Sequence, residues 1–174
     1  HQIPLLRNPV MIVAFSGWND AAEAASGAVE HLLSGWRDKS DEVVPELIAD
    51  VDSEDFYDFQ VNRPQVSIDD SEIRSITWPT TQVFGLAIPS MQRDLVIVTG
   101  VEPSMRWKNF TADLLDLADD LEVSLVMTLG SLLADTPHSR PITVTGTGAH
   151  PSMASRLGVS VSKYEGPTGI LGII

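Results

Sequence analysis

The stretch VMIVAFSGWND, Val10–Asp20, decides how the rest of this chain can fold. Its first six residues are continuously apolar and rich in β-branched side chains, the pattern of a strand buried on both faces of a parallel sheet. Ser16 and Gly17 end that run, and Asn19 or Asp20 can cap the helix that follows. A strand, a glycine turn and a helix N-terminus form the kind of loop at which open α/β sheets bind ligands.

Two later runs, Leu95–Thr99 and Val123–Leu129, have the same apolar character as the first strand. An amphipathic helix from about Arg106 to Glu122 separates them. A strand, a helix and a strand in succession form a crossover unit, which makes its two strands parallel. We therefore predict an α/β protein whose mostly parallel sheet has these three strands as near neighbours, each buried on both faces.

Between the first helix and Leu95 the pattern is that of short strands. Leu47–Val51 is one strand candidate. Three further runs are separated by turns that contain Asp, Pro and Thr. They indicate antiparallel strands or an edge hairpin: Val66–Ile68, Ile73–Trp78 and Gln82–Ile88. The sequence thus predicts a small β excursion around residues 66–88 beside the main sheet.

The C-terminal third is less regular, with short strands expected at Ile142–Val144 and Val159–Val161 and a helix at His150–Leu157. No linker or internal repeat interrupts the chain, so a single α/β domain over residues 1–174 is predicted. The chain ends in the apolar run GPTGILGII without a helix stop. That ending predicts a fragment that lacks a further C-terminal segment.

Composition narrows the class of partner. The formal net charge is −13 and the isoelectric point is near 4.4, so a nucleic acid or an anionic membrane surface would be repelled. There is no cysteine, which excludes disulfides and thiolate catalysis within these residues and fits the cytoplasm. No apolar run approaches the length of a membrane span. We expect a cytoplasmic protein without nucleic-acid or membrane partners.

Five loops are dense in Gly, Pro and functional side chains: SGWND, GVEPSMRW, LGSLLADTPHSRP, TGTGAHPS and YEGPTG. The chain resembles the proteasome assembly chaperone 2 family, in its bacterial, actinobacterial-like branch. The resemblance is carried by four motifs in this order and spacing: SGWNDAAEA, TGVEPSMRW, LGSLLADTPHSRP and YEGPTGI. The resemblance covers nearly the whole chain. It implies a three-layer α/β/α sandwich similar to phosphorylase/hydrolase-like folds, and a helical C-terminal segment beyond this chain.

Residues of these loops are the candidates for ligand binding. If the loops Ser16–Asp20, Gly100–Trp107 and Gly130–Arg140 leave the same sheet edge, they share one crevice, and Trp18, Glu102, Arg106, His138 and Arg140 should lie near one another. Each also has a structural reading: Trp18 can cap the core, Asp20 can cap a helix, and Arg106 can pair with Glu102. His138 and Arg140 lie between two prolines, which stiffen a loop able to hold a carboxylate or phosphate. The candidates are Ser16, Gly17, Trp18, Asp20, Glu102, Arg106, Ser131, His138, Arg140, Gly166 and Thr168.

Motifs for common chemistries are missing from the sequence. The four histidines are scattered without metal-ligand spacing, and neither a GxSxG elbow nor a Walker loop occurs. No metal and no cofactor are therefore predicted, and catalytic residues stay unassigned.

The leading hypothesis is a chaperone-like assembly or protein-binding factor, for which the resemblance names proteasome subunits as a partner class. The 11 prolines, the aromatic residues Phe56, Tyr57 and Phe59 and the β excursion also predict a homo-oligomer. The alternative is a protein that binds a small molecule, either an anion or a nucleoside-like ligand, or a hydrolase/phosphorylase-like enzyme. In both cases the strand-end loops would form the site.

Overall fold

The computed structural model describes residues 4–39, 43–148 and 151–174. These residues form two compact units. The first unit runs to Leu132 and includes Thr168–Ile174, and the second unit is Leu133–Pro167. The expectation of a single domain over residues 1–174 stays a prediction.

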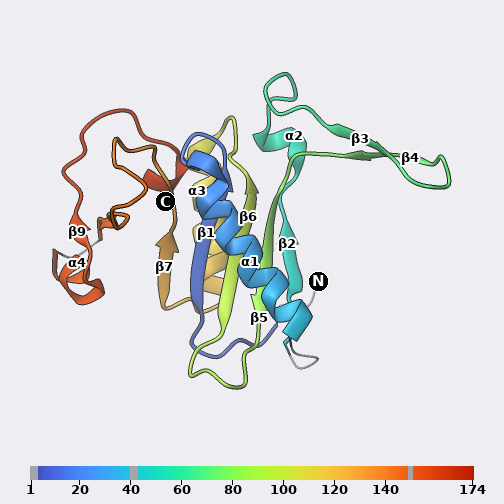
Figure 1. Ribbon diagram of the computed structural model, residues 1–174. Coiled ribbons are helices and arrows are strands. Elements are labelled where there is room, and N and C mark those ends of the chain that lie inside the picture. The colour runs from blue at the N-terminus through green and yellow to red at the C-terminus, as the bar shows by residue number, and fades with distance from the viewer. Residues whose placement is uncertain (1–3, 40–42, 149–150) are drawn as a thin grey trace. The chain divides into compact units, whose positions relative to one another are not determined.

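A five-stranded mixed sheet forms the centre of the first unit (Figure 1). In spatial order its strands are β2 (Glu46–Asp50), β5 (Thr81–Leu86), β6 (Leu95–Val101), β1 (Val10–Ser16) and β7 (Leu125–Thr128). β1 pairs in parallel with β6 and β7, whereas β5 pairs antiparallel with β2 and β6. The α/β class is confirmed, and the sheet is mixed because β5 is inserted between β2 and β6.

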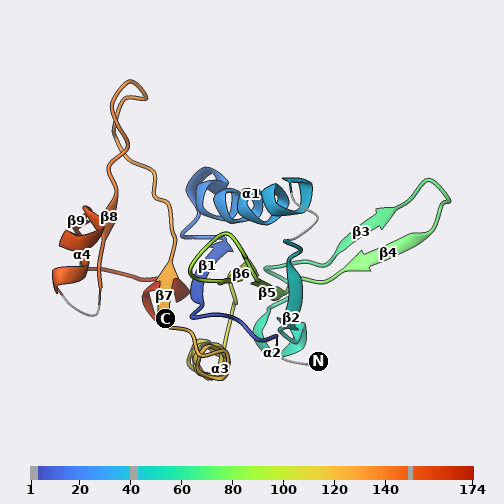
Figure 2. The same ribbon diagram turned by 90° about the horizontal axis from the view of Figure 1, so that it is seen from below.

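Helices cover both faces of this sheet, so the first unit has three layers (Figure 2). Its helical elements are η1 (Ala21–Glu23), α1 (Ala24–Lys39), α2 (Ser53–Phe56), α3 (Trp107–Asp120) and η2 (Ile170–Gly172). Met11 and Phe15 of β1 belong to the core that includes Phe110 of α3, whereas Ile12 belongs to the core that includes Val29 of α1. The continuous apolar run of β1 therefore serves two cores, because successive side chains of a strand point to opposite faces.

The three predicted central strands are neighbours in the order β6, β1 and β7, and all are parallel. β1 is buried through Phe15, and Val96–Val98 of β6 are fully buried. The prediction that Val123–Leu129 is buried on both faces is wrong, since β7 is only half-buried and its last residue, Thr128, is exposed. β7 lies at the edge of the sheet and pairs with β1 alone among the described strands, so fewer neighbours cover it.

The β excursion is smaller than expected. β3 (Gln65–Ile68) and β4 (Arg74–Thr77) form an antiparallel hairpin that extends away from the sheet in Figures 1 and 2, and all eight residues are exposed. Gln82–Ile88 does not belong to it. Most of that run forms β5, inside the main sheet, because Val83 and Leu86 are buried in its two cores.

The second unit contains β8 (Thr145–Gly146), α4 (Pro151–Leu157) and β9 (Ser160–Val161), with β8 and β9 paired in parallel. The helix and the last strand agree with the expectation, although His150 lies outside the described residues. Ile142–Val144 is not a strand, and Ile142 is 90% exposed. No helix in the described parts of the chain is long and apolar enough to cross a membrane.

Candidate functional site

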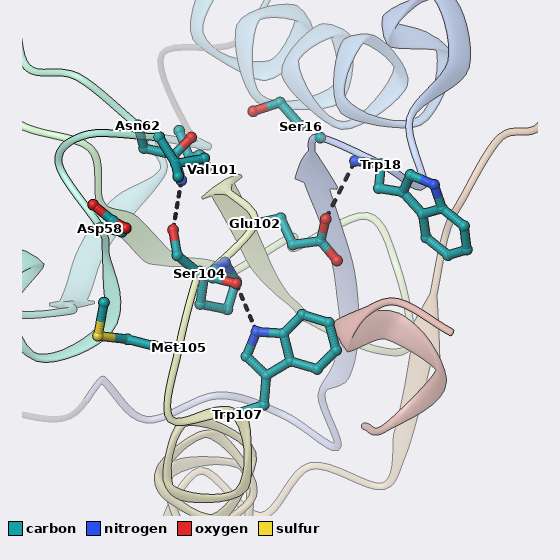
Figure 3. A pocket seen from close by; sticks show the side chains of 12 residues that line it. Ser16, Trp18, Asp58, Asn62, Val101, Glu102, Ser104, Met105 and Trp107 are labelled. Atoms are coloured by element: carbon teal, nitrogen blue, oxygen red, sulfur yellow. Dashed lines mark hydrogen bonds between the residues drawn. The ribbon is translucent and has the colours of Figure 1, made fainter. Parts of the chain in front are cut away.

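A pocket of about 400 Å³ opens in the first unit where β1 and β6 end (Figure 3). Its lining comes from the loop after β1, from the loop after β6 and from the connection between α2 and β3. The lining residues are Ser16, Gly17, Trp18, Asp58, Val61, Asn62, Val101, Glu102, Pro103, Ser104, Met105 and Trp107. The carboxyl ends of parallel strands are where α/β sheets place ligands, so this is the candidate site.

Glu102 connects three segments of the chain at the centre of this site. Its carboxylate accepts hydrogen bonds from the backbone N–H of Trp18 (3.2 Å) and from that of Ile170 (3.0 Å). Its own N–H donates to the carbonyl oxygen of Ser16. One side chain thus joins the loop after β1, the loop after β6 and the last turn of the chain.

Gly17 makes this approach possible. Its φ of +145° is in the region that favours glycine, and a Cβ placed there would lie 3.0 Å from Cβ of Glu102. The glycine in the SGWND loop therefore serves a close contact between two loops.

Asp20 is a structural carboxylate. It is 7% exposed, and its side chain accepts hydrogen bonds from the N–H groups of Ala25 (2.8 Å) and Ser26 (3.2 Å) and from the hydroxyls of Ser26 and Ser131. Burial by itself disfavours the charge, but these hydrogen bonds together outweigh it and lower the pKa of Asp20. The structure thus supports the capping role for Asp20 and brings Ser131 beside it.

Asp94 is a second carboxylate of this kind, at the start of β6. Burial opposes its charge, yet hydrogen bonds from the N–H groups of Ile88 and Arg7, together with the Arg7 guanidinium at 3.0 Å, lower its pKa. A folded-state pKa below the unfolded value stabilises the protein above the unfolded pKa, and that contribution is lost as the pH falls.

We therefore expect the free energy of unfolding to fall as the pH drops below about 4, the usual pKa of an Asp side chain. Asp94→Asn should be less stable than the parent at pH 7 and should show a smaller loss between pH 5 and pH 3. Urea unfolding at each pH measures both. An equal pH dependence in the parent and the variant would contradict the assignment to Asp94.

Arg106 is close to the pocket but does not line it. Its guanidinium forms an ion pair with Asp55 and lies 5.7 Å from the ring centroid of Phe56. The pairing with Glu102 that the four-residue spacing suggested is wrong, because Glu102 is directed toward backbone N–H groups.

The structure brings together only some of the predicted site residues. Ser16, Gly17, Trp18 and Glu102 line the pocket, and Thr168 is an exposed residue of the first unit that precedes Gly169. His138, Arg140 and Gly166 are exposed residues of the second unit. The convergence of His138 and Arg140 with Trp18, Glu102 and Arg106 stays a prediction.

Sequence reasoning missed the part of the pocket that the connection after α2 supplies. Asp58, Val61 and Asn62 reach it because the backbone N–H groups of Ser104 and Met105 donate to the carbonyl oxygen of Phe56. The side-chain amide of Asn62 also donates to the hydroxyl of Ser104 (2.8 Å), as Figure 3 shows. The only sequence signal was the mixture of aromatic and acidic residues in this segment.

The lining has a clear chemical character. It contains two carboxylates and two tryptophans, and none of the twelve residues is Lys, Arg or His. Nor do the described residues contain a group of three or more His, Cys, Asp or Glu side chains that could hold a metal ion. The arrangement can bind a ligand through carboxylate oxygens and aromatic surface.

Comparison with known proteins places this chain in a family. The PAC2 family model matches residues 14–174, whereas no curated protein matches. A crystal structure of a PAC2 family protein from Streptomyces avermitilis has 51% sequence identity and a TM-score of 0.83, and the match covers 95% of this chain and 67% of that one.

Two structures from Mycobacterium tuberculosis are also similar. One is described as a proteasome-assembly chaperone homologue, with 43% identity, a TM-score of 0.83, and 94% of this chain and 66% of that one covered. The other, of unknown function, has 24% identity and a TM-score of 0.81 over 99% of this chain and 59% of that one, and it shares the fold. The chain spans about two thirds of the length of its first two relatives. The resemblance in its loop motifs is thereby confirmed, and the chain belongs to the PAC2 family.

Proposed function

We propose that this chain is a cytoplasmic, chaperone-like assembly factor that acts as a homo-oligomer and binds protein partners. The name of the Mycobacterium tuberculosis homologue supports a role in assembly and makes proteasome subunits the first partner class to test. The observation that carries the proposal is the β3–β4 hairpin, which exposes apolar side chains outside both cores of the first unit.

The hairpin has one apolar face and one polar face. Val66 lies opposite Ile76, and Ile68 lies opposite Arg74. The four side chains share a face because directly paired residues point the same way and residues two apart along a strand lie on the same side. Val66 is 50% exposed, Ile68 68% and Ile76 53%. On the other face, the hydroxyls of Ser67 and Ser75 are hydrogen-bonded at 2.7 Å.

An isolated two-stranded hairpin is marginally stable in water, and three exposed β-branched residues on one face add a cost that burial would remove. A second copy of the chain offers the same face in return, which is what a two-fold interface requires. The base of the hairpin is fixed by the rings of Phe59 and Trp78, whose centroids are 4.8 Å apart. We therefore assign the apolar face of the hairpin to contact between copies.

A pair of double variants tests this face. Val66→Asp with Ile76→Lys places an opposite-charge pair on the apolar face, and Ser67→Asp with Ser75→Lys places the same pair on the polar face. Both leave the net charge unchanged and favour the same strand pairing. Burying two such side chains contributes about 3 kcal/mol or more, so the first variant should weaken self-association by about 100-fold.

Light scattering coupled to gel filtration measures the mass of each protein, and circular dichroism checks that each is folded. The parent and the polar-face variant should form oligomers at micromolar concentration, and the apolar-face variant should be a folded monomer. A monomeric parent would contradict the homo-oligomer proposal. Equal dissociation of both variants would show that the apolar face of the hairpin is not the interface between copies.

The rival function, a phosphorylase/hydrolase-like enzyme or a small-molecule binding protein, draws its support from the pocket at the strand ends. A thermal-shift screen with nucleosides, phosphates and amino-acid derivatives separates the two functions. A true ligand at 100 times its dissociation constant would add about 2.7 kcal/mol of stability. A panel without a stabilising compound leaves the assembly factor as the better reading.

A further inference from the structure

The chain leaves the first unit and returns to it at one place. It departs near Gly130 and comes back at Gly169, and both glycines lie against Asn19. A Cβ on Gly130 would lie 3.2 Å from the carbonyl oxygen of Asn19, and a Cβ on Gly169 would overlap the side-chain amide of Asn19. The second unit, residues 133–167, is therefore a closed excursion of the chain whose two ends meet within the first unit.

The departing end is held by the backbone. The N–H of Ser131 donates to the carbonyl oxygen of Asn19 (2.7 Å), and the N–H of Ala21 donates to the carbonyl oxygen of Ser131 (3.1 Å). The hydroxyl of Ser131 adds a hydrogen bond to the carbonyl oxygen of Ala21 (3.0 Å). Because the first two bonds join main-chain atoms, they do not depend on any one side chain.

The returning end, Thr168–Ile174, depends on a single side chain. The N–H of Ile170 donates to Oε1 of Glu102 (3.0 Å), and among the described residues this is the one hydrogen bond between the segment and the rest of the first unit. The other hydrogen bonds of the segment are internal to it. Ile170 is also fully buried, in the same core as Phe15. One carboxylate and apolar packing thus hold the returning end.

Glu102 uses both of its carboxylate oxygens at this junction. Oε1 accepts from the N–H of Ile170, and Oε2 accepts from the N–H of Trp18 (3.2 Å), the direction that Figure 3 shows. A glutamine has a single acceptor oxygen, so it could keep one of these hydrogen bonds but not both. Hydrogen bonds to an ionised acceptor are also the stronger class. The junction therefore needs a carboxylate.

We infer that Glu102 is a positioning residue that acts as a latch on the second unit. With the latch closed, which means that its carboxylate accepts from Trp18 and Ile170, residues 133–167 are fixed at both ends. With the latch open, Thr168–Ile174 leaves the first unit while the five-stranded sheet stays folded. Segments with few hydrogen bonds to their surroundings open locally in this way, at a lower free energy than the whole domain. The chain thus has a closed form and an extended form of its second unit.

Hydrogen exchange, measured by NMR at each amide, tests the latch. The variants are Glu102→Ala, the conservative Glu102→Gln, and Gly169→Ala, whose Cβ would lie 2.7 Å from Oε1 of Glu102. Asp58→Asn is the matched control, because it removes a carboxylate from the same pocket that accepts from Gln60 instead. The amides of β6 report unfolding of the whole unit, since β6 is the middle strand of the sheet.

Exchange at the amide of Ile170 should become about tenfold to 100-fold faster in Glu102→Ala, the range for a lost hydrogen bond to a charged group. Glu102→Gln should lie between that variant and the parent, because it keeps one acceptor. The amides of β6 should keep their parent rates, and Asp58→Asn should match the parent at Ile170. Combining Glu102→Ala with Gly169→Ala should accelerate exchange by less than the product of the two single factors, because both act on the same contact.

A parent rate at Ile170 in Glu102→Ala would overturn the latch. Equal acceleration at Ile170 and in β6 would also overturn it, because Glu102 would then stabilise the whole unit. If Glu102→Ala does not fold, Gly169→Ala decides: faster exchange confined to Thr168–Ile174 supports the latch, and an unfolded protein refutes it. The latch goes beyond the proposed function and can fail separately, because none of these rates depends on the mass measured by light scattering.

Discussion

Gly100→Ala should destabilise this protein by roughly 3 to 5 kcal/mol, a large part of the free energy of unfolding of an ordinary domain. Gly100 lies in the central strand β6, paired with Phe15 of β1 and Thr81 of β5. Its φ is +150°, and a Cβ there would overlap the carbonyl oxygen of Thr80 and lie 2.8 Å from Cα of Thr81. Because the obstacle is backbone of a neighbouring strand, no side-chain rotation can relieve it.

Gly27→Ala is the matched control for this substitution. Gly27 is inside α1, and nothing lies within 4 Å of the Cβ it would gain. The same chemical change should there stabilise the protein by about 0.5 to 1 kcal/mol, because alanine has the higher helix propensity. Urea unfolding of both variants measures the two effects, and a Gly100→Ala protein as stable as the parent would show that the strand ends are not packed as described.

Asp20→Ala should cost about 2 to 4 kcal/mol, which is the second large effect that the structure predicts. The substitution removes the acceptor for the N–H groups of Ala25 and Ser26 at the start of α1. It also releases the hydroxyl of Ser131, which links Asp20 to the loop after β7. Buried donors that lose their partner carry their full desolvation cost.

Two further variants serve as comparisons for the loss of stability in Asp20→Ala. Asp20→Asn keeps one oxygen for the backbone N–H groups but loses the charge, so its loss of stability should be smaller than that of Asp20→Ala. Asp116→Ala, on the exposed face of α3, should change stability by about 0.5 kcal/mol at most. If Asp20→Ala behaved like Asp116→Ala, the capping role would be wrong, and a role for Asp20 in ligand binding would gain support.

Much of the fold follows from local patterns in the sequence. The apolar runs at Val10–Phe15 and Leu95–Thr99 indicate buried parallel strands because such strands need no polar face, and the β3–β4 hairpin follows from alternation between turns. The loop motifs also identify the PAC2 family. Local patterns do not reveal where a strand lies in the sheet: the apolar run that forms β7 is an edge strand, whereas the Gln82–Ile88 run, expected in the excursion, provides β5 in the interior of the sheet.

The candidate site, like the fold, could be predicted from the sequence only in part. The sequence by itself predicted that the loops after β1 and β6 would meet, because Trp18 and Glu102 follow two apolar runs expected to be parallel strands, whose carboxyl ends share one sheet edge. Only the tertiary structure decided what completes the pocket. Asp58 enters through backbone hydrogen bonds to the carbonyl oxygen of Phe56, and Arg106 is withdrawn by Asp55, 51 residues away. Pairings between segments so distant along the chain depend on the packed fold, and no periodicity or local spacing encodes them.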